Sequence, residues 1–168
     1  MNPALFDATV PVFIRGLKAL DACLHKAQAH ADALKCDVSN ILGARLAPDM
    51  FPLGRQIQIA CDFAKGVSAR LADVDMPSFE DTETTLAEYK ARIAKTIDFL
   101  ATLPADKFAG AETRNIVILR GDTKREYTGL NYAHHAGLPN FYFHVTTAYN
   151  ILRHNGVAIG KKDFIGSV

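Results

Sequence analysis

The hydrophobic positions of this chain follow a helical repeat over most of its length. In three long stretches, apolar residues return at steps of three and four, which places them on one side of an α-helix. These stretches run from 10 to 34, from 53 to 71 and from 86 to 103, and a fourth, shorter one runs from 141 to 152. Each apolar stripe must be covered by another helix, so the pattern predicts an all-α four-helix bundle formed by a single domain, residues 1–168.

Residues that start and stop helices stand at the ends of these stretches. Pro11 lies near the start of the first stretch, so we expect the regular helix to begin there. Pro52 precedes the second, and Thr85 opens a capping box before the third. Pro139 near the start of the last stretch and Gly156 just after it give this helix clear limits.

The segments between the stripes predict connections of different kinds. Residues 37–47 indicate a connector with a short helix, 73–83 a polar loop, and the residues from 157 onward a tail. The direction of the helices stays open, because the long 104–138 connection allows either a crossover or an antiparallel return.

One part of that long connection has a strand-like pattern. Residues 116–119 and 127–130 are short apolar runs on either side of Gly121 to Lys124. Such runs around a turn sequence are typical of a β-hairpin. We therefore expect a small hairpin before the last helix.

Composition and charge narrow the possible partners. Nineteen basic and eighteen acidic residues give a formal charge of +1, which offers no global attraction to nucleic acid or to an anionic membrane. No apolar run approaches the roughly 18 residues that span a bilayer, and the N-terminus lacks the pattern of a secretory signal. The three cysteines lack CxxC spacing, so reduced thiols and a cytoplasmic location are expected.

His144 is the first candidate for chemistry. Phe141, Val145 and Ala148 flank it at helical spacings, so its ring should point to the bundle interior or its edge. It could bind a metal, act as an acid or base, or hydrogen-bond a neighbouring helix, and the last role is the commonest for a buried polar side chain. Ala148 occupies the i+4 position where a metal-binding helix presents its second histidine, which argues against a metal. Gln56, beside the second stripe, could reach the core near His144.

Other candidate residues lie just before the last helix. His134 and His135 precede the turn into that helix, and Asn140 follows it, so they could complete a site with His144 at one end of the bundle. Adjacent loop histidines more often face solvent. The chain contains no GxxxxGK[ST], GxGxxG or HExxH motif, so phosphate-loop, dinucleotide and zincin chemistry have no support.

The segment from Leu138 to Gly156, LPNFYFHVTTAYNILRHNG, resembles the last helix of the DinB/YfiT-like superfamily. That helix typically carries His-x-x-x-His followed by Leu-Arg-x-x-Gly. The order of elements and the 48–52 entry into the second helix are similar to a branch of that superfamily known only as a domain of unknown function.

The resemblance implies a four-helix bundle, often dimeric, with a divalent metal held by one histidine of the second helix and two of the fourth. Some members use this metal in thiol-transfer or hydrolytic chemistry. His144 matches the first histidine of the fourth helix, whereas Ala148 stands in place of the second. Residues 53–71 contain no histidine, and Gln56 best matches the vacated position. The resemblance therefore implies that this chain lacks the usual metal site.

Three hypotheses for function remain, and whether the chain is an enzyme stays open. The leading one is a DinB-like bundle without a cofactor that binds a small molecule, or forms a homodimer, through a pocket lined by Gln56, His134, Asn140 and His144. The second is a thiol-transfer or hydrolase enzyme that uses zinc, nickel or manganese, held by His144 with His134 or His135. The third is a structural or partner-binding protein whose polar residues only stabilise the fold.

Overall fold

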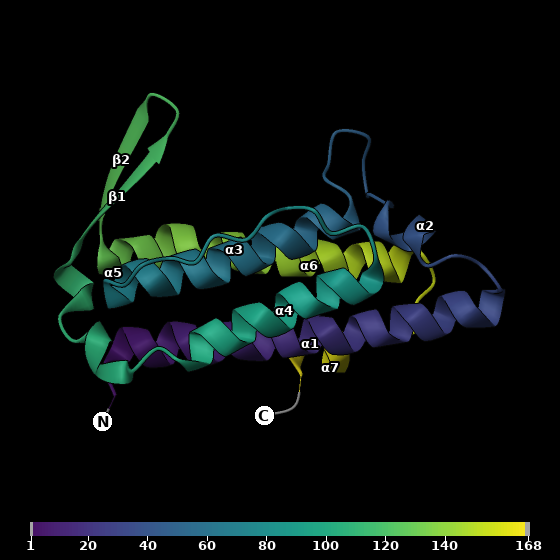
Figure 1. The fold of residues 1–168 in the computed structure, drawn as a ribbon, viewed down its shortest axis with the longest axis horizontal. Helices are drawn as coiled ribbons and strands as arrows, with labels where there is room; N and C mark the ends of the chain where they lie inside the picture. The colour runs from purple at the N-terminus through teal and green to yellow at the C-terminus, as the bar shows by residue number, and fades with distance from the viewer. Residues whose placement is uncertain (1, 167–168) are drawn as a thin grey trace.

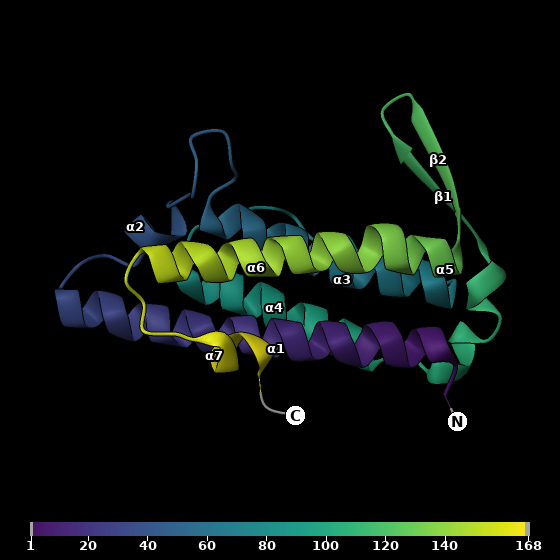
Figure 2. The same ribbon diagram turned by 180° about the vertical axis from the view of Figure 1, so that it is seen from behind.

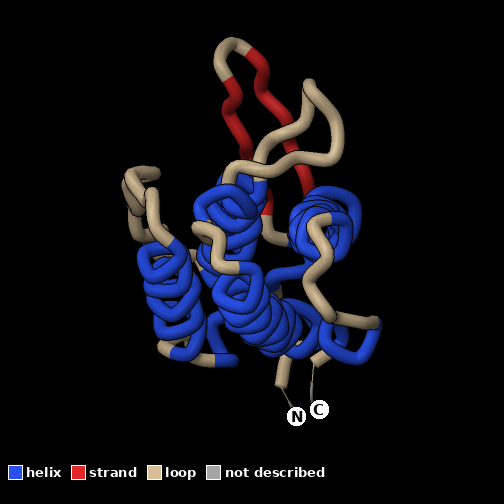
Figure 3. Tube along the Cα trace, turned by 90° about the vertical axis from the view of Figure 1, so that its right-hand side faces the viewer, coloured by secondary structure: helices blue, strands red, loops and turns tan. Residues whose placement is uncertain are grey.

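The computed structural model describes residues 2–166 and contains the predicted bundle of four long helices (Figure 1). They are α1 (Ala4–Leu34), α3 (Leu53–Ala72), α4 (Leu86–Ala101) and α6 (Leu138–His154). Figure 3 shows them nearly end-on, grouped around one core. The predicted stripes supply most of the largest fully buried side chains of that core, including Phe13, Leu17, Leu24, Leu53, Ile57, Leu71, Ile93, Leu100 and Phe141.

The helix ends match the sequence signals at Pro52, which directly precedes α3, and at Thr85 and Gly156, but they differ at Pro11. At the start of α4 the Thr85 hydroxyl accepts a hydrogen bond from the Glu88 backbone, and the Glu88 carboxylate accepts one from the Thr85 backbone, which completes the capping box. Gly156 follows α6 with a φ of 87°, which favours glycine. The expected start at Pro11 was wrong, because α1 begins at Ala4 and contains the proline in its early turns.

Short elements complete the chain. The connector contains α2 (Ser39–Leu42), and two 3₁₀ turns, Ala105–Phe108 and Ala111–Thr113, follow α4. The tail forms α7 (Lys161–Ile165), which the sequence pattern did not predict and which lies against α1 (Figure 2). Before α6, the helix α5 (Gly129–Tyr132) and a π-helical turn (Ala133–Gly137) join it without a break.

The hairpin is present, but its second strand lies earlier than predicted. Strand β1 (Asn115–Arg120) pairs antiparallel with β2 (Thr123–Thr128) across a two-residue turn whose first residue, Gly121, has a φ of 56°. The predicted range 127–130 extends into α5, because the Thr128 hydroxyl accepts a hydrogen bond from the Asn131 backbone and starts that helix. The hairpin projects away from the bundle (Figures 1 and 3).

Contacts between helices settle their direction. The rings of Phe13 and Phe141, 4.7 Å apart, join the early parts of α1 and α6, and His30 contacts the Asn155 carbonyl near their ends, so these helices run parallel. Asp62 and Arg92, whose charged atoms lie 2.9 Å apart, join the first halves of α3 and α4, which also run parallel. The crossover is therefore made by residues 73–85, which run back along the bundle (Figure 1). The 104–138 connection is therefore the antiparallel return, which joins α4 to α6.

None of the helices within residues 2–166 combines the length and the apolarity that crossing a membrane requires.

Candidate functional site

Gln56 of α3 and His144 of α6 are in direct contact. Nδ1 of His144 lies 2.7 Å from Oε1 of Gln56, and Nε2 of Gln56 donates a 3.0 Å hydrogen bond to the Phe51 carbonyl. Because a carbonyl can only accept, the amide nitrogen of Gln56 must face Phe51 and its oxygen must face the imidazole. His144 therefore carries its proton on Nδ1 and leaves an electron pair on Nε2.

Aromatic rings surround this imidazole. The ring of Phe63 stacks on it at 5.9 Å with an interplanar angle of 17°, and the ring of Phe143 meets it edge-on at 5.2 Å. Within residues 2–166, Nε2 has no hydrogen-bond partner, and it is not one of the fully buried unpaired side-chain atoms, which are Ser68 Oγ and Arg92 Nε. Nε2 therefore keeps some access to solvent, while His144 as a whole is 8% exposed.

The imidazole of His144 is neutral at ordinary pH. Burial disfavours the charged form and is the larger cause, and the positive charge of Arg55 adds to it, which together lower the pKa of His144 to about 4. A neutral imidazole with this pKa is a hydrogen-bond acceptor but a weak base.

The other predicted site residues are placed differently. Asn140 lies one turn before His144 on α6, and its side chain donates to the Ala136 carbonyl at 2.7 Å. His134 and His135 lie on the π-helical turn, and both are exposed. Nine or ten residues of continuous helix separate them from His144, which corresponds to about 14 Å along the axis. The structure thus brings Gln56 and His144 together, with Asn140 close by, and leaves the two loop histidines apart.

The residues present do not fit the metal that the superfamily resemblance implies. A zinc site needs at least three nitrogen, sulfur or carboxylate ligands within about 2.3 Å of the ion. Here one imidazole faces an amide, and Ala148, which is fully buried, stands at the third position. No group of three His, Cys, Asp or Glu side chains among residues 2–166 could hold a metal ion.

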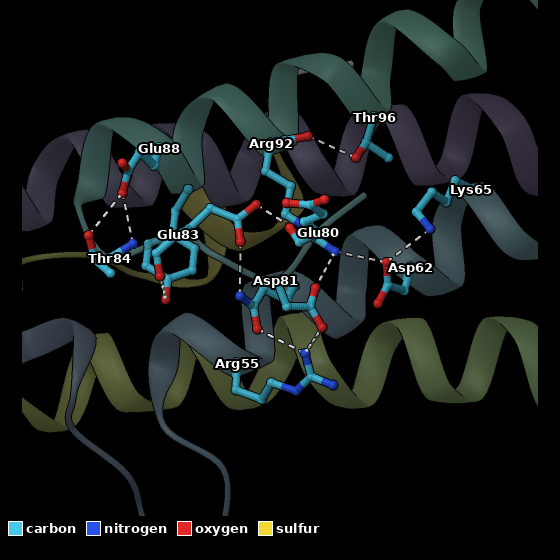
Figure 4. Close-up of polar contacts among 12 residues, drawn as sticks. Arg55, Asp62, Lys65, Glu80, Asp81, Glu83, Thr84, Glu88, Arg92 and Thr96 are labelled. Carbon is cyan, nitrogen blue, oxygen red and sulfur yellow. Dashed lines mark hydrogen bonds and ion pairs between the residues drawn. The ribbon is translucent and has the colours of Figure 1, made fainter. Parts of the chain in front are cut away.

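A second polar cluster lies where the crossover segment, residues 73–85, meets α3 and α4 (Figure 4). Its centre is Arg92, whose side chain is 1% exposed. The guanidinium contacts Asp62, Asp81 and Glu83, each at 2.9 Å, and donates to the Glu80 carbonyl at 3.0 Å. Because Asp81 and Glu83 belong to the crossover segment, Arg92 attaches that segment to the bundle.

Further charged groups strengthen this attachment. Arg55 pairs with Asp81, and the Gln58 amide donates to Glu83 at 2.9 Å. Burial alone would raise the pKa of Glu83, but the hydrogen bonds from Arg92 and Gln58 outweigh it and hold this pKa below its usual value. Three cationic side chains also lie over the ring of Phe79, namely Lys65, Arg92 and Lys95.

Sequence reasoning missed this cluster, although one signal was available. Arg92 stands at a stripe position of α4, between Tyr89 and Thr96 at helical spacing, where an apolar residue is expected. Its carboxylate partners come from two other segments, α3 and the crossover segment, so only the packing brings them together. Charges of the two signs balance: Arg55, Lys65 and Arg92 face Asp62, Asp81 and Glu83. We interpret this cluster as a structural clamp.

A hollow on the surface of the bundle lies away from both clusters. It has a volume of about 720 Å³ and is bordered by the outer face of α1 and by α7, with Pro11, Ile14, Arg15, Lys18 and Lys162 among its lining residues. Gln56 and His144 do not line it.

The fold and the helix positions of Gln56 and His144 define a DinB-like helical bundle. Residues 5–165 match the family model DUF1993, a domain of unknown function, and the chain belongs to this family. A crystal structure of a DinB family member from Shewanella denitrificans has 46% sequence identity and a TM-score of 0.93, and the match covers 98% of this chain and 93% of that one. The comparison with curated proteins found no match.

Proposed function

We propose that the face around His144 binds a small ligand that carries a hydrogen-bond donor. The observation that supports this best is the hydrogen bond between Gln56 and His144, because it fixes the tautomer and leaves Nε2 as an acceptor at the surface. A preoriented acceptor between aromatic rings suits a planar group with a hydroxyl or amine.

Binding fits this residue better than proton transfer does. A general base works best with a pKa near the working pH, whereas the pKa of His144 is about 4. The surrounding rings of Phe63 and Phe143 provide apolar contact area for a flat ligand. The leading function is therefore recognition, with no covalent or redox step.

Phenol and anisole test this proposal as a matched pair of probes. Both present an aromatic ring, but only phenol has a hydroxyl that can donate to Nε2. A hydrogen bond contributes about 1 kcal/mol, so phenol should bind about fivefold more tightly than anisole in an NMR titration. His144→Phe should remove this preference, and His134→Asn, an exposed control, should retain it. Equal binding of the two probes to the wild-type protein would contradict the proposal.

A homodimer is a second candidate, since large aromatic side chains on this face are exposed to solvent. Phe51 and Phe143 are 55% and 56% exposed, and exposed aromatic residues next to an arginine are typical of protein interfaces. Sedimentation equilibrium tests it. A dimer that dissociates on Phe143→Ser, but not on Leu119→Ser in the hairpin, would support the α6 face, and a wild-type monomer at high concentration would exclude it.

A further inference from the structure

Arg55 lies between the ligand face and the clamp. It precedes Gln56 on α3, and its guanidinium carbon is 6.0 Å from the centre of the Phe51 ring, whose backbone carbonyl holds Gln56. The Arg55 side chain is 37% exposed, so solvent and ligands can reach it.

The hydrogen bonds of Arg55 leave part of its guanidinium free. Both of its contacts within residues 2–166 use Nη1, one to Gln58 Oε1 at 2.9 Å and one to Asp81. An arginine side chain has five N–H donors, and Nε with Nη2 forms a planar fork that matches the two oxygens of a carboxylate. Asp81 also contacts Arg92 at 2.9 Å, so its charge stays compensated if Arg55 turns toward a ligand.

Arg55 also acts on His144 through its charge. Its positive charge disfavours the imidazolium and adds to the effect of burial on the pKa of His144. Asp81 also contacts this guanidinium, but the charge of Asp81 is shared with Arg92 at 2.9 Å. An anionic ligand group on the free edge would therefore still meet net attraction from Arg55.

We propose that this face selects an aromatic carboxylic acid that also carries a hydroxyl group, and this inference rests on the proposed function. The carboxylate binds the free fork of Arg55, the hydroxyl donates to Nε2 of His144, and the ring lies against the exposed rings of Phe51 and Phe143. Arg55 thereby selects a negatively charged ligand, and His144 selects a ligand that carries a hydrogen-bond donor.

Three probes separate these two roles: 4-hydroxybenzoate, its neutral isostere 4-hydroxybenzamide, and benzoate. We expect 4-hydroxybenzoate to bind at least about tenfold more tightly than the amide, because a bidentate charge-assisted contact exceeds 1.4 kcal/mol. Arg55→Gln should reduce its affinity to that of the amide, whereas Arg45→Gln, which removes an exposed arginine of the 44–52 loop, should have no effect. Isothermal titration calorimetry measures all of these affinities.

Each outcome decides between the two proposals. Equal binding of the acid and the amide, or an unchanged affinity in Arg55→Gln, would overturn the role of Arg55 and leave the role of His144 standing. Binding of none of the three probes, or binding that His144→Phe does not weaken, would overturn both. Arg55→Gln could loosen the fold by releasing Asp81, and Arg55→Lys controls for this because it keeps the charge but lacks the fork. Arg55→Lys should bind 4-hydroxybenzoate more weakly than the wild-type protein does, but more tightly than the wild-type protein binds 4-hydroxybenzamide.

Discussion

Replacement of His144 by glutamine should change how stability depends on pH. In the unfolded chain a histidine has a pKa of about 6.5, whereas the folded chain holds His144 at about 4. Because the pKa is lower in the folded chain, neutral His144 contributes its full share of the unfolding free energy above pH 6.5. This contribution is lost as the pH falls toward 4. At pH 5 His144 is almost fully protonated in the unfolded chain and mostly neutral in the folded chain. The protein therefore loses about 2 kcal/mol of its unfolding free energy relative to pH 7.5.

Urea denaturation at pH 7.5 and pH 5 measures this loss. The wild-type protein should lose about 2 kcal/mol more of its unfolding free energy over this interval than His144→Gln does. The variant keeps an amide that can face Gln56, and the lowered pKa of Glu83 keeps this carboxylate of the clamp ionised at pH 5 in both proteins. His135→Gln, which removes an exposed histidine, should respond like the wild type. An identical pH response of the wild type and His144→Gln would refute the burial of a neutral imidazole.

Three further substitutions test the packing around the two clusters. Arg92→Met should lower the unfolding free energy by about 3 kcal/mol, since it leaves carboxylates of the clamp without their cation; a loss below 1 kcal/mol in urea denaturation would contradict the clamp. Gly54→Ala should lower the unfolding free energy by about 2 kcal/mol, because its new Cβ would lie 2.3 Å from the Tyr89 hydroxyl. Adding Tyr89→Phe to the same chain should recover part of the lost melting temperature. Ala148→His should destabilise the protein by about 2 kcal/mol through overpacking. Added zinc should not restore the melting temperature, since Gln56 still stands where the superfamily has the histidine of its second helix.

The helices and the central pair could be predicted from the sequence because both depend on local spacing. The stripes alone place Leu53, Ile57 and Phe141 in the core, and the structure buries all three. Gln56 and His144 each stand beside such a stripe, so their contact follows once α3 and α6 pack together. The superfamily resemblance supplied that pairing of helices, and the structure contains the contact between Gln56 of α3 and His144 of α6.

The direction of the helices and the clamp could not be predicted in the same way. A polar stretch such as 73–85 gives the same local signal whether it turns sharply or runs back along the bundle. The contacts of Arg92 with Asp81 and Glu83 exist only because it runs back, and they attach a segment that has no fully buried residue. The second strand was misplaced for a related reason, since Leu130 has an apolar side chain suited to a strand, but the Thr128 cap starts a helix there.

The state of the His144 ring tests the central claim most directly. Two-dimensional NMR of protein labelled with ¹⁵N-histidine distinguishes the two ring nitrogens and their protonation. We predict a protonated Nδ1 and an unprotonated Nε2 at pH 7, no titration until the pH approaches 4, and a shift of the Nε2 resonance when 4-hydroxybenzoate is added. A proton on Nε2, or titration near pH 6.5, would contradict the account.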